Sequence, residues 1–255
     1  MSQSQLIPVA PNSVRVWTGF RLPTLKQETF FEKLGSVFCP ISVQMQARVG
    51  LTAYLPSVLP VEKPAAAPDE IALVFYREGE TESQNTYHLA KTTVGGRAYS
   101  DLHALVFDLT RSLSGFPNRF SGNINADGRY YLFDESVDWQ YGTVNVIVGV
   151  RTGTDQQEFL SHVATWLQRV QNHGGPDGAI AATSPDYVAY WEHWSVEAKA
   201  KDSRIRELAE LAETVYDQRI PPHPLPEGLW TPYDGLQITG GESFNFQFER
   251  DEPPV

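Results

Sequence analysis

The stretch Val14-Arg-Val16-Trp-Thr-Gly19-Phe-Arg21-Leu-Pro-Thr24-Leu-Lys-Gln27-Glu28 returns 130 positions later as Val144-Asn-Val146-Ile-Val-Gly149-Val-Arg151-Thr-Gly-Thr154-Asp-Gln-Gln157-Glu158. Seven of the fifteen positions are identical without a gap, where average residue usage gives roughly one. An internal repeat indicates the architecture of a chain before any local feature does. This repeat predicts a tandem duplication in which both halves open with the same local structure.

Each copy of the repeat predicts a strand followed by a helix. Residues 14–20 and 144–150 are rich in β-branched and aromatic side chains, which favour a half-buried strand. Thr24 and Thr154 each precede a glutamine by three positions, a spacing typical of a helix N-cap in a capping box. Apolar residues then follow at helical spacing in both copies: Phe30, Phe31, Leu34 and Phe38, and Phe159, Leu160, Val163, Trp166, Leu167 and Val170.

Composition and charge limit the classes of partner. The 255 residues are 41% hydrophobic and 12% aromatic, enough for a substantial core in one large domain or two small ones. A net charge of −11 without a visible basic patch argues against nucleic acid and anionic membranes as partners. Cys39 is the only cysteine, which excludes an intrachain disulfide and a cysteine-rich zinc site. With neither a signal peptide nor an apolar run of ~20 residues, we expect a soluble, cytoplasmic monomer or homodimer.

The rest of the chain alternates strand and helix patterns. Strands are expected at residues 49–55, 71–76, 130–133, 179–182 and 244–248. The sequence Asn125-Ala-Asp127-Gly128 predicts a plain β-turn rather than a calcium loop, so no metal site is expected.

Three further helical stretches are predicted. The first covers residues 82–113 with a break at Gly95-Gly96, and its second part carries a buried stripe: Leu102, Leu105, Val106 and Leu109. The second is capped by Ser184 with Pro185 at its first position. The third covers residues 199–216, with apolar residues on one face and charges on the other.

This order of elements resembles the ferredoxin-like unit of the dimeric α+β barrel superfamily, in which two units face their sheets together around a cavity. The resemblance implies an α+β fold of two ferredoxin-like halves whose antiparallel sheets form a pseudo-dimeric α+β barrel. We expect a flexible lead-in at 1–12, the first half at 13–135, the second half at 136–250 and a frayed tail at 251–255. The two consecutive helices predicted in the second half depart from the unit, which has a strand pair before its last helix.

Histidines of the 82–113 stretch are the first catalytic candidates. His88 and His103 share this stretch with Arg97 and Tyr99. Histidine exchanges protons near neutral pH, and tyrosine or arginine stabilises an oxyanion. On a barrel fold the stretch would flank the cavity, so we expect His103 or His88 as base and Tyr99 or Arg97 as oxyanion support. The alternative is that His103, between two leucines, is a packing residue.

A second candidate group lies in Tyr187-Val-Ala-Tyr190-Trp191-Glu192-His193-Trp194, within the helix that starts after Ser184. Chlorite dismutases, dye-decolourising peroxidases and aldoxime dehydratases are tandem α+β barrels that hold haem through a helical histidine of the C-terminal half. Resemblance to them implies His193 as a haem b ligand, while Tyr187 and Trp191 are expected to bind substrate. The alternative is an aromatic helix face that belongs to the core and binds no cofactor.

The repeated arginines Arg21 and Arg151 follow the two matched strands. They either grip an anionic substrate, or each pairs with a glutamate of its own half.

Taken with the resemblance, these residues predict a cofactor-independent enzyme of the lyase or isomerase type. Its substrate would be hydrophobic, aromatic or polyketide-like, and acid/base isomerisation, cyclisation or dehydration would occur in a cavity between the sheets. One alternative is a haem-dependent dehydratase or peroxidase-like enzyme with His193 as axial ligand. The other is a non-enzymatic binding or assembly module.

Overall fold

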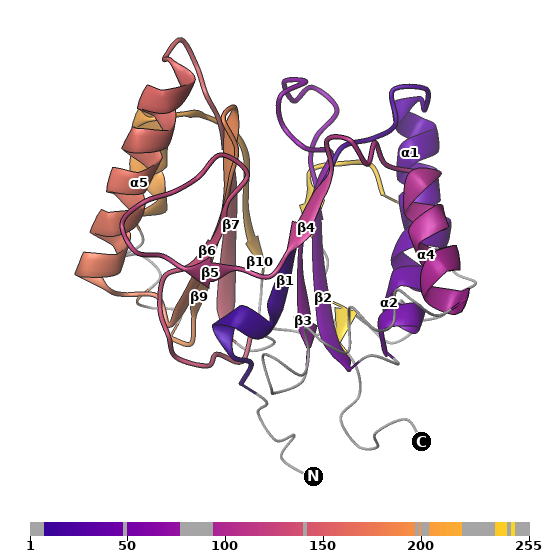
Figure 1. Ribbon diagram of the computed structural model, residues 1–255, viewed down its shortest axis with the longest axis horizontal. Coiled ribbons are helices and arrows are strands. Elements are labelled where there is room, and N and C mark those ends of the chain that lie inside the picture. Colours follow the sequence, from indigo (N-terminus) through magenta and orange to yellow (C-terminus); the bar gives the residue numbers. More distant parts are fainter. Residues whose placement is uncertain are drawn as a thin grey trace.

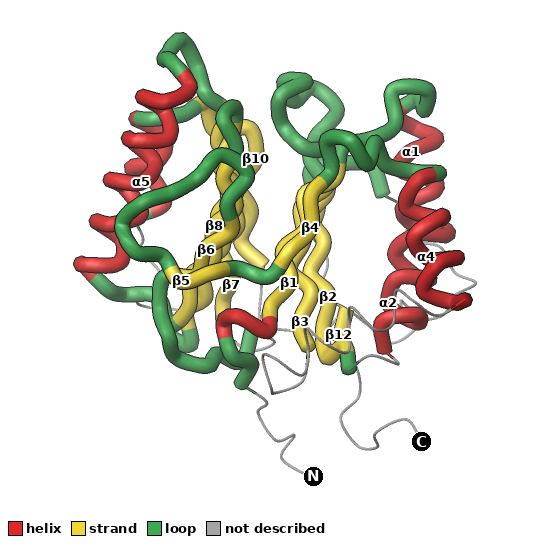
Figure 2. The backbone as a smooth tube through the Cα atoms, in the orientation of Figure 1, coloured by secondary structure: helices red, strands yellow, loops and turns green. Residues whose placement is uncertain are grey.

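The structure is a computed structural model that describes residues 8–47, 50–76, 94–139, 142–196, 199, 204–220, 238–243 and 246–247. Two largely antiparallel sheets stand face to face, and helices cover the outer face of each sheet (Figure 1). The tube view shows the same four layers by element type, in the order helix, sheet, sheet, helix (Figure 2).

The first sheet has the strand order β11-β2-β3-β1-β4, with antiparallel neighbours throughout. Its strands are β1 (Val14–Gly19), β2 (Leu51–Val58), β3 (Glu70–Tyr76), β4 (Leu113–Gly115), β11 (Glu242–Ser243) and β12 (Phe246–Gln247), the last of which also pairs with β2. The helical segments of this half are η1 (Pro11–Ser13), α1 (Gln27–Lys33), η2 (Leu34–Phe38), α2 (Cys39–Ala47) and α4 (Val94–Ala104). Residues 27–47 form one continuous rod, because the π-helical η2 joins α1 to α2.

The second sheet has the strand order β10-β7-β9-β8-β6-β5, antiparallel except for the β5–β6 pair. Its strands are β5 (Asn118–Arg119), β6 (Arg129–Tyr131), β7 (Thr143–Val150), β8 (Gly178–Thr183), β9 (Tyr187–Trp194) and β10 (Glu213–Ile220). The helical segments are α5 (Gln156–His173) and the short 3-10 helix η4 (Ile205–Glu210). All six apolar residues predicted for the helix after the second repeat are buried on α5.

Both halves share one topology. In each, the order is strand, helix, strand, strand, helix, strand, and the first strand lies between the third and the fourth: β2-β3-β1-β4 and β8-β9-β7-β10. The expected α+β fold of two ferredoxin-like halves is therefore confirmed, with η4 in the place of the second helix of the second half. The sheets also exchange edge strands across the predicted boundary at 135/136, since β5 and β6 join the second sheet while β11 and β12 join the first.

The inner faces of the two sheets bury each other in one apolar layer. Successive side chains of a strand point to opposite faces of its sheet, so alternate residues of each strand enter this layer. From the first sheet they include Val14, Val16, Phe20, Ala53, Leu55, Ile71, Leu73 and Phe75, and from the second Val144, Val146, Val148, Ile180, Ala182, Ala189, Trp191 and Tyr216. We call this set the inter-sheet layer.

Side chains close one side of the barrel. The Tyr216 hydroxyl of β10 lies 2.5 Å from Ser243 Oγ of β11, which in turn lies 2.7 Å from Ser57 Oγ of β2. Three hydroxyl groups thus join the two sheets where the described strands form no ladder between them.

The helices that follow the repeats begin later than the capping boxes predict. Helix α1 has Lys26 at its N-cap and no side-chain cap. At α5 the cap is Asp155, whose Oδ1 accepts from the backbone N–H groups of Gln157 at 2.8 Å and Glu158 at 3.4 Å. The prediction of Thr24 and Thr154 as caps was wrong: the Asp155 carboxylate next to Thr154 satisfies the donors of α5, and α1 starts at Gln27 without a side-chain cap.

The first-half helical stretch is shorter than expected. Residues 82–93 lie outside the described part, and Gly95 and Gly96 fall in the first turn of α4 rather than at a break. Leu105 and Leu109 are 62% and 50% exposed, because α4 ends at Ala104 and the chain turns away before the predicted stripe is complete.

Two predicted helices of the second half are wrong. Ser184 and Pro185 form the turn of the β8–β9 hairpin, and residues 187–194 are a strand that pairs with β7 and β8. Both faces of this strand are buried, so its sequence lacks the polar alternation that marks a half-exposed strand. Of the helix predicted at residues 199–216, the described part 204–216 holds η4 and the start of β10, which restores the strand order of the unit.

No helix of the described segments is both long and apolar enough to cross a membrane.

The repeated glycines Gly19 and Gly149 lie where neighbouring side chains leave no room for a Cβ, and a substitution tests this constraint. A Cβ on Gly19 would lie 2.6 Å from Phe107 Cε1, and one on Gly149 would lie 2.8 Å from Ala212 Cβ. In both halves the segment after the second helix therefore packs on bare backbone of the first strand. We expect Gly149→Ala to lower the free energy of unfolding by about 1–3 kcal/mol through overpacking.

Denaturant melts measure this effect. Gly115→Ala is the control, because its Cβ would meet its nearest neighbour, Arg129 Cδ, at an ordinary 3.5 Å. Equal stability of Gly149→Ala and the wild type would contradict the packing described.

Candidate functional site

Strand β9 carries the predicted aromatic group on two opposite faces. Tyr187, Ala189 and Trp191 belong to the inter-sheet layer, and His193 follows them on the same face by alternation. The other residues of β9 face α5 and the outer layer: Val188, Tyr190, Glu192 and Trp194. Three predicted site residues, Tyr187, Trp191 and His193, therefore share one face of a strand, although they were placed on a helix.

The Trp191 indole is the unusual polar group of the inter-sheet layer. The residue is 0% exposed, and its Nε1–H has no acceptor among the described residues. Its partners across the ladder, Val146 and Ile180, are apolar. A buried donor without an acceptor costs about 1–3 kcal/mol, so this N–H marks a position where an acceptor would stabilise the protein.

Tyr187 supplies a second polar group at the end of the same face. Its ring packs edge-to-face against Phe20 with 6.0 Å between the ring centres. Burial raises the pKa of the Tyr187 phenol, while the Thr18 hydroxyl and the positive charges of Arg129 and Arg111 lower it in part. The net shift is upward, so the phenol keeps its proton at neutral pH and is available as a hydrogen-bond donor.

Arg129 of β6, the strand next to the edge strand β5 of the second sheet, reaches the same end of the layer. Its Nη1 donates to the Asp127 carbonyl at 3.1 Å. Its Nε is buried without an acceptor among the described residues. Burial lowers the pKa of Arg129, and the nearby Tyr187 and Asp127 raise it in part. A guanidinium and a protonated phenol thus face one region between the sheets.

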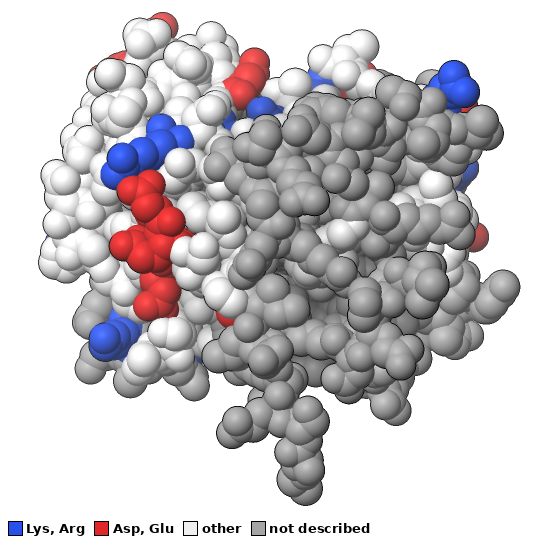
Figure 3. All heavy atoms as spheres, turned by 60° about the horizontal axis from the view of Figure 1, so that its bottom comes forward, with Lys and Arg blue, Asp and Glu red and all other residues white. Residues whose placement is uncertain are grey.

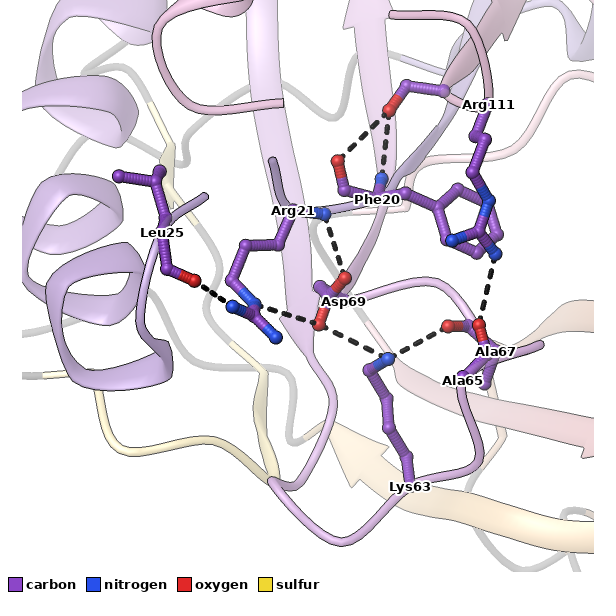
Figure 4. Close-up of polar contacts among 9 residues, drawn as sticks. Phe20, Arg21, Leu25, Lys63, Ala65, Ala67, Asp69 and Arg111 are labelled. Carbon is purple, nitrogen blue, oxygen red and sulfur yellow. Dashed lines mark hydrogen bonds and ion pairs between the residues drawn. The ribbon is translucent and has the colours of Figure 1, made fainter. Parts of the chain in front are cut away.

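A rim of charged residues borders this region where the β2–β3 loop meets the end of β1 (Figure 4). The Asp69 carboxylate accepts from the Arg21 backbone N–H at 2.8 Å, and its Oδ1 lies 3.2 Å from Lys63 Nζ and 3.9 Å from Arg21 Nε. Arg111 places its guanidinium carbon 4.0 Å from the ring centre of Phe20 and donates to the Ala65 carbonyl at 3.0 Å.

The two repeated arginines have corresponding partners. Arg21 donates from Nη1 to the Leu25 carbonyl and pairs with Asp69, while Arg151 donates to the Thr154 carbonyl at 2.6 Å and to Asp186 Oδ1 at 2.7 Å. Each arginine therefore pairs with an aspartate of its own half, where the sequence alternative named a glutamate. Both side chains hold the turn between strand and helix.

The histidine candidates of the first half lie elsewhere. His103 is on α4 in the outer layer, where its Nδ1 lies 2.8 Å from the Tyr99 carbonyl and its ring packs against Trp17 and Phe38. The Tyr99 hydroxyl lies 2.9 Å from Ser42 Oγ, and Arg97 is exposed. None of these three faces the inter-sheet layer, because α4 covers the opposite face of the first sheet. His88 lies outside the described residues.

His193 does not fit a haem ligand. The residue is 3% exposed, its Nδ1 lies 3.7 Å from Asp177 Oδ2, and its ring is 5.6 Å from that of Trp139. Its Nε2 lies against Gly142, where an added Cβ would approach it to 2.9 Å. Protein groups thus enclose the ring on both sides, and the ligand role would require the surrounding backbone to move.

A buried carboxyl group lies in the outer layer of the first sheet. Glu70 is 0% exposed, and it accepts from Tyr54 OH at 2.6 Å and from Trp17 Nε1 at 3.1 Å. Burial raises the pKa of Glu70 to about 7, although both hydrogen bonds and Arg15 lower it in part. Burial and the Glu70 charge together raise the pKa of the neighbouring Cys39 thiol.

Sequence reasoning missed four residues of the region: Thr18, Lys63, Arg111 and Arg129. Lys63 lies in a proline-alanine connector and Arg111 in the segment after α4, so no periodic pattern marks them. One available signal was the strand pattern of residues 14–20, which places Thr18 on the same face as two valines of the core.

Comparison with known proteins leaves the family open. No family model and no curated protein matches the chain. Among solved structures, a proposed monooxygenase from Fusobacterium nucleatum subsp. nucleatum has a TM-score of 0.36 and an anthrone oxidase-like protein one of 0.33. Each is 9% identical, with 81% of this chain and 88% of the other chain covered. A likeness at this level carries no statement about activity.

The buried Glu70 makes stability depend on pH. Its folded-state pKa of about 7 is above the ordinary value of 4.5, so folding favours the protonated form. The free energy of unfolding should fall as pH rises from about 4.5 to about 7, by roughly 3 kcal/mol, and then stay level. Glu70→Gln should remove this fall, because the amide cannot ionise.

Urea melts at pH 5 and pH 8 measure the difference. Tyr54→Phe is the companion variant, because it removes a hydrogen bond that lowers the pKa of Glu70. The pKa of Glu70 should be higher in this variant, so its free energy of unfolding should continue to fall up to a higher pH than in the wild type. A Glu70→Gln variant with the same pH profile as the wild type would contradict the assignment.

Proposed function

We propose that the protein is a small-molecule enzyme that holds a hydrophobic, aromatic substrate between its two sheets. The observation that carries the proposal is the Trp191 indole N–H, which is fully buried in an apolar layer without an acceptor among the described residues. A substrate carbonyl would accept this hydrogen bond, and the apolar side chains around it would take the ring system. Ala182 and Ala189 lie directly opposite each other on β8 and β9. Their side chains are short, so the inner face of the sheet beside Trp191 carries little side-chain bulk.

The chemistry proposed is acid/base conversion through an anionic oxygen. When a base removes a proton next to a substrate carbonyl, negative charge moves to the carbonyl oxygen. The protonated Tyr187 phenol would donate to that oxygen, and the Arg129 guanidinium would offset its charge. Isomerisation, aldol-type cyclisation and elimination of water next to a carbonyl pass through such an oxyanion, so they remain the proposed reaction types. In this scheme His103 is a packing residue.

Binding is tested with 1-tetralone, a neutral aromatic ketone, and two matched tryptophan variants. Trp191→Phe removes the unpaired indole, and we expect it to weaken 1-tetralone binding about tenfold, the loss of one good hydrogen bond. Trp194→Phe is the control on the opposite face of β9, where Nε1 donates to Glu192 Oε1 at 2.9 Å. It should lower stability and leave binding unchanged. Calorimetric titration and thermal melts give both quantities.

Turnover is tested by deuterium exchange at carbon 2 of 1-tetralone, followed by NMR in D2O. The solvent removes the proton, the enolate oxygen is stabilised in the site, and a deuteron returns to the same carbon. We expect acceleration by the wild type, loss in Tyr187→Phe, and retention in Tyr190→Phe, whose hydroxyl faces Glu192 in the outer layer. Binding without exchange would favour a binding module, and equal binding by Trp191→Phe and wild type would refute the site.

A further inference from the structure

We infer that the charged rim next to Tyr187 is an oxyanion subsite, formed by Arg21, Lys63 and Arg111, that binds a carboxylate or phosphate group of the substrate. The inference rests on the proposed function, because it assigns an acidic group to the same molecule. It narrows the substrate class from hydrophobic compounds to aromatic acids or their phosphates.

The geometry shows more positive than negative charge around one carboxylate (Figure 4). Asp69 is shared, since its Oδ1 lies 3.2 Å from Lys63 Nζ and 3.9 Å from Arg21 Nε. Both partners of the shorter pair are buried, with side chains 7% and 9% exposed. Arg111 lies close enough for its charge to lower the pKa of Lys63. Two cations thus pair with one buried anion, and a third lies near Lys63.

The second half provides an internal comparison. Arg151 occupies the position of Arg21 in the repeat and pairs with Asp186 at 2.7 Å. That pair is complete with one cation and one anion, and it is sufficient to hold the strand-to-helix turn. Lys63 and Arg111, the additional cations near Arg21, therefore have no counterpart among the described residues at the strand-to-helix turn of the second half.

Hydrogen bonds to the β2–β3 loop explain part of the arrangement. Lys63 Nζ donates to the Ala67 carbonyl at 2.8 Å, and Arg111 Nη2 donates to the Ala65 carbonyl at 3.0 Å. These contacts hold the loop and would be made equally well by uncharged donors. They do not neutralise the rim, where three cations face two carboxylates: Asp69, which pairs with Lys63 and Arg21, and Asp108, which lies near Arg111.

Burial makes the charge on Lys63 costly, because its side chain is only 7% exposed. Burial lowers the pKa of Lys63, and the charges of Arg21 and Arg111 lower it further, while Asp69 raises it. An oxyanion next to Lys63 and the two guanidinium groups would relieve this repulsion, and charge-assisted hydrogen bonds of this kind are the stronger ones in proteins. The chain as a whole carries −11, and acidic side chains line up on the opposite, lower face over the second half (Figure 3).

Calorimetric titration at low ionic strength tests the subsite with two probes, benzoate and inorganic phosphate. We expect saturable binding to the wild type, and about tenfold weaker binding in Lys63→Met and in Arg111→Gln. Arg151→Gln is the matched control and should bind the probes as the wild type does. Thermal melts of each variant separate lost binding from lost folding, and Lys63→Arg should restore binding.

The outcomes separate this inference from the proposed function. Neutral 1-tetralone should bind to Lys63→Met as it does to the wild type, while Trp191→Phe should bind 1-tetralone more weakly and bind phosphate as the wild type does. Binding of 1-tetralone without any anion binding by the wild type would overturn the subsite alone. Equal weakening in Arg151→Gln would also overturn it, because general surface charge would then explain the result.

Discussion

The contact that the rest of the structure depends on is the apolar layer between the two sheets. Each ferredoxin-like half has helices on one face only, so its other face must be buried by its partner. Strand alternation then decides which residues enter the shared layer, and β1 and β9 contribute Val16 and Trp191 to it. Any polar group of these strands on the inner face must find a partner within the layer or from a ligand.

The distribution of indole hydrogen bonds follows from this constraint. The indoles of Trp17 and Trp194 point to the outer layers, where each donates to a buried glutamate. Trp191 points inward and has no such acceptor among the described residues. The outer layers are therefore completed by the protein, whereas the inner layer presents donors from Tyr187, Arg129 and Trp191. That asymmetry places the proposed chemistry between the sheets and leaves Glu70 and His103 as parts of the outer packing.

Much of the fold was predictable because the repeat and the periodic segments carry it. The strands that start each half and helix α5 were found from β-branched runs and helical spacing. Strand β9 was missed, because burial on both faces removes the alternation that distinguishes a strand from a helix. The candidate site was predictable only in part. Tyr187 and Trp191 stand out as aromatic residues, but Lys63 and Arg111 lie on connecting segments that only the tertiary fold brings close to each other.

In the proposed site, an acceptor atom of the ligand meets the Trp191 N–H between the sheets. The most direct measurement is a ¹⁵N–¹H spectrum of the indole groups during titration with 1-tetralone, with Trp191 assigned from its Phe variant. We predict a saturable downfield shift of the Trp191 indole proton, while the signals of Trp17 and Trp194 stay in place. An unchanged Trp191 signal at saturating 1-tetralone would contradict it.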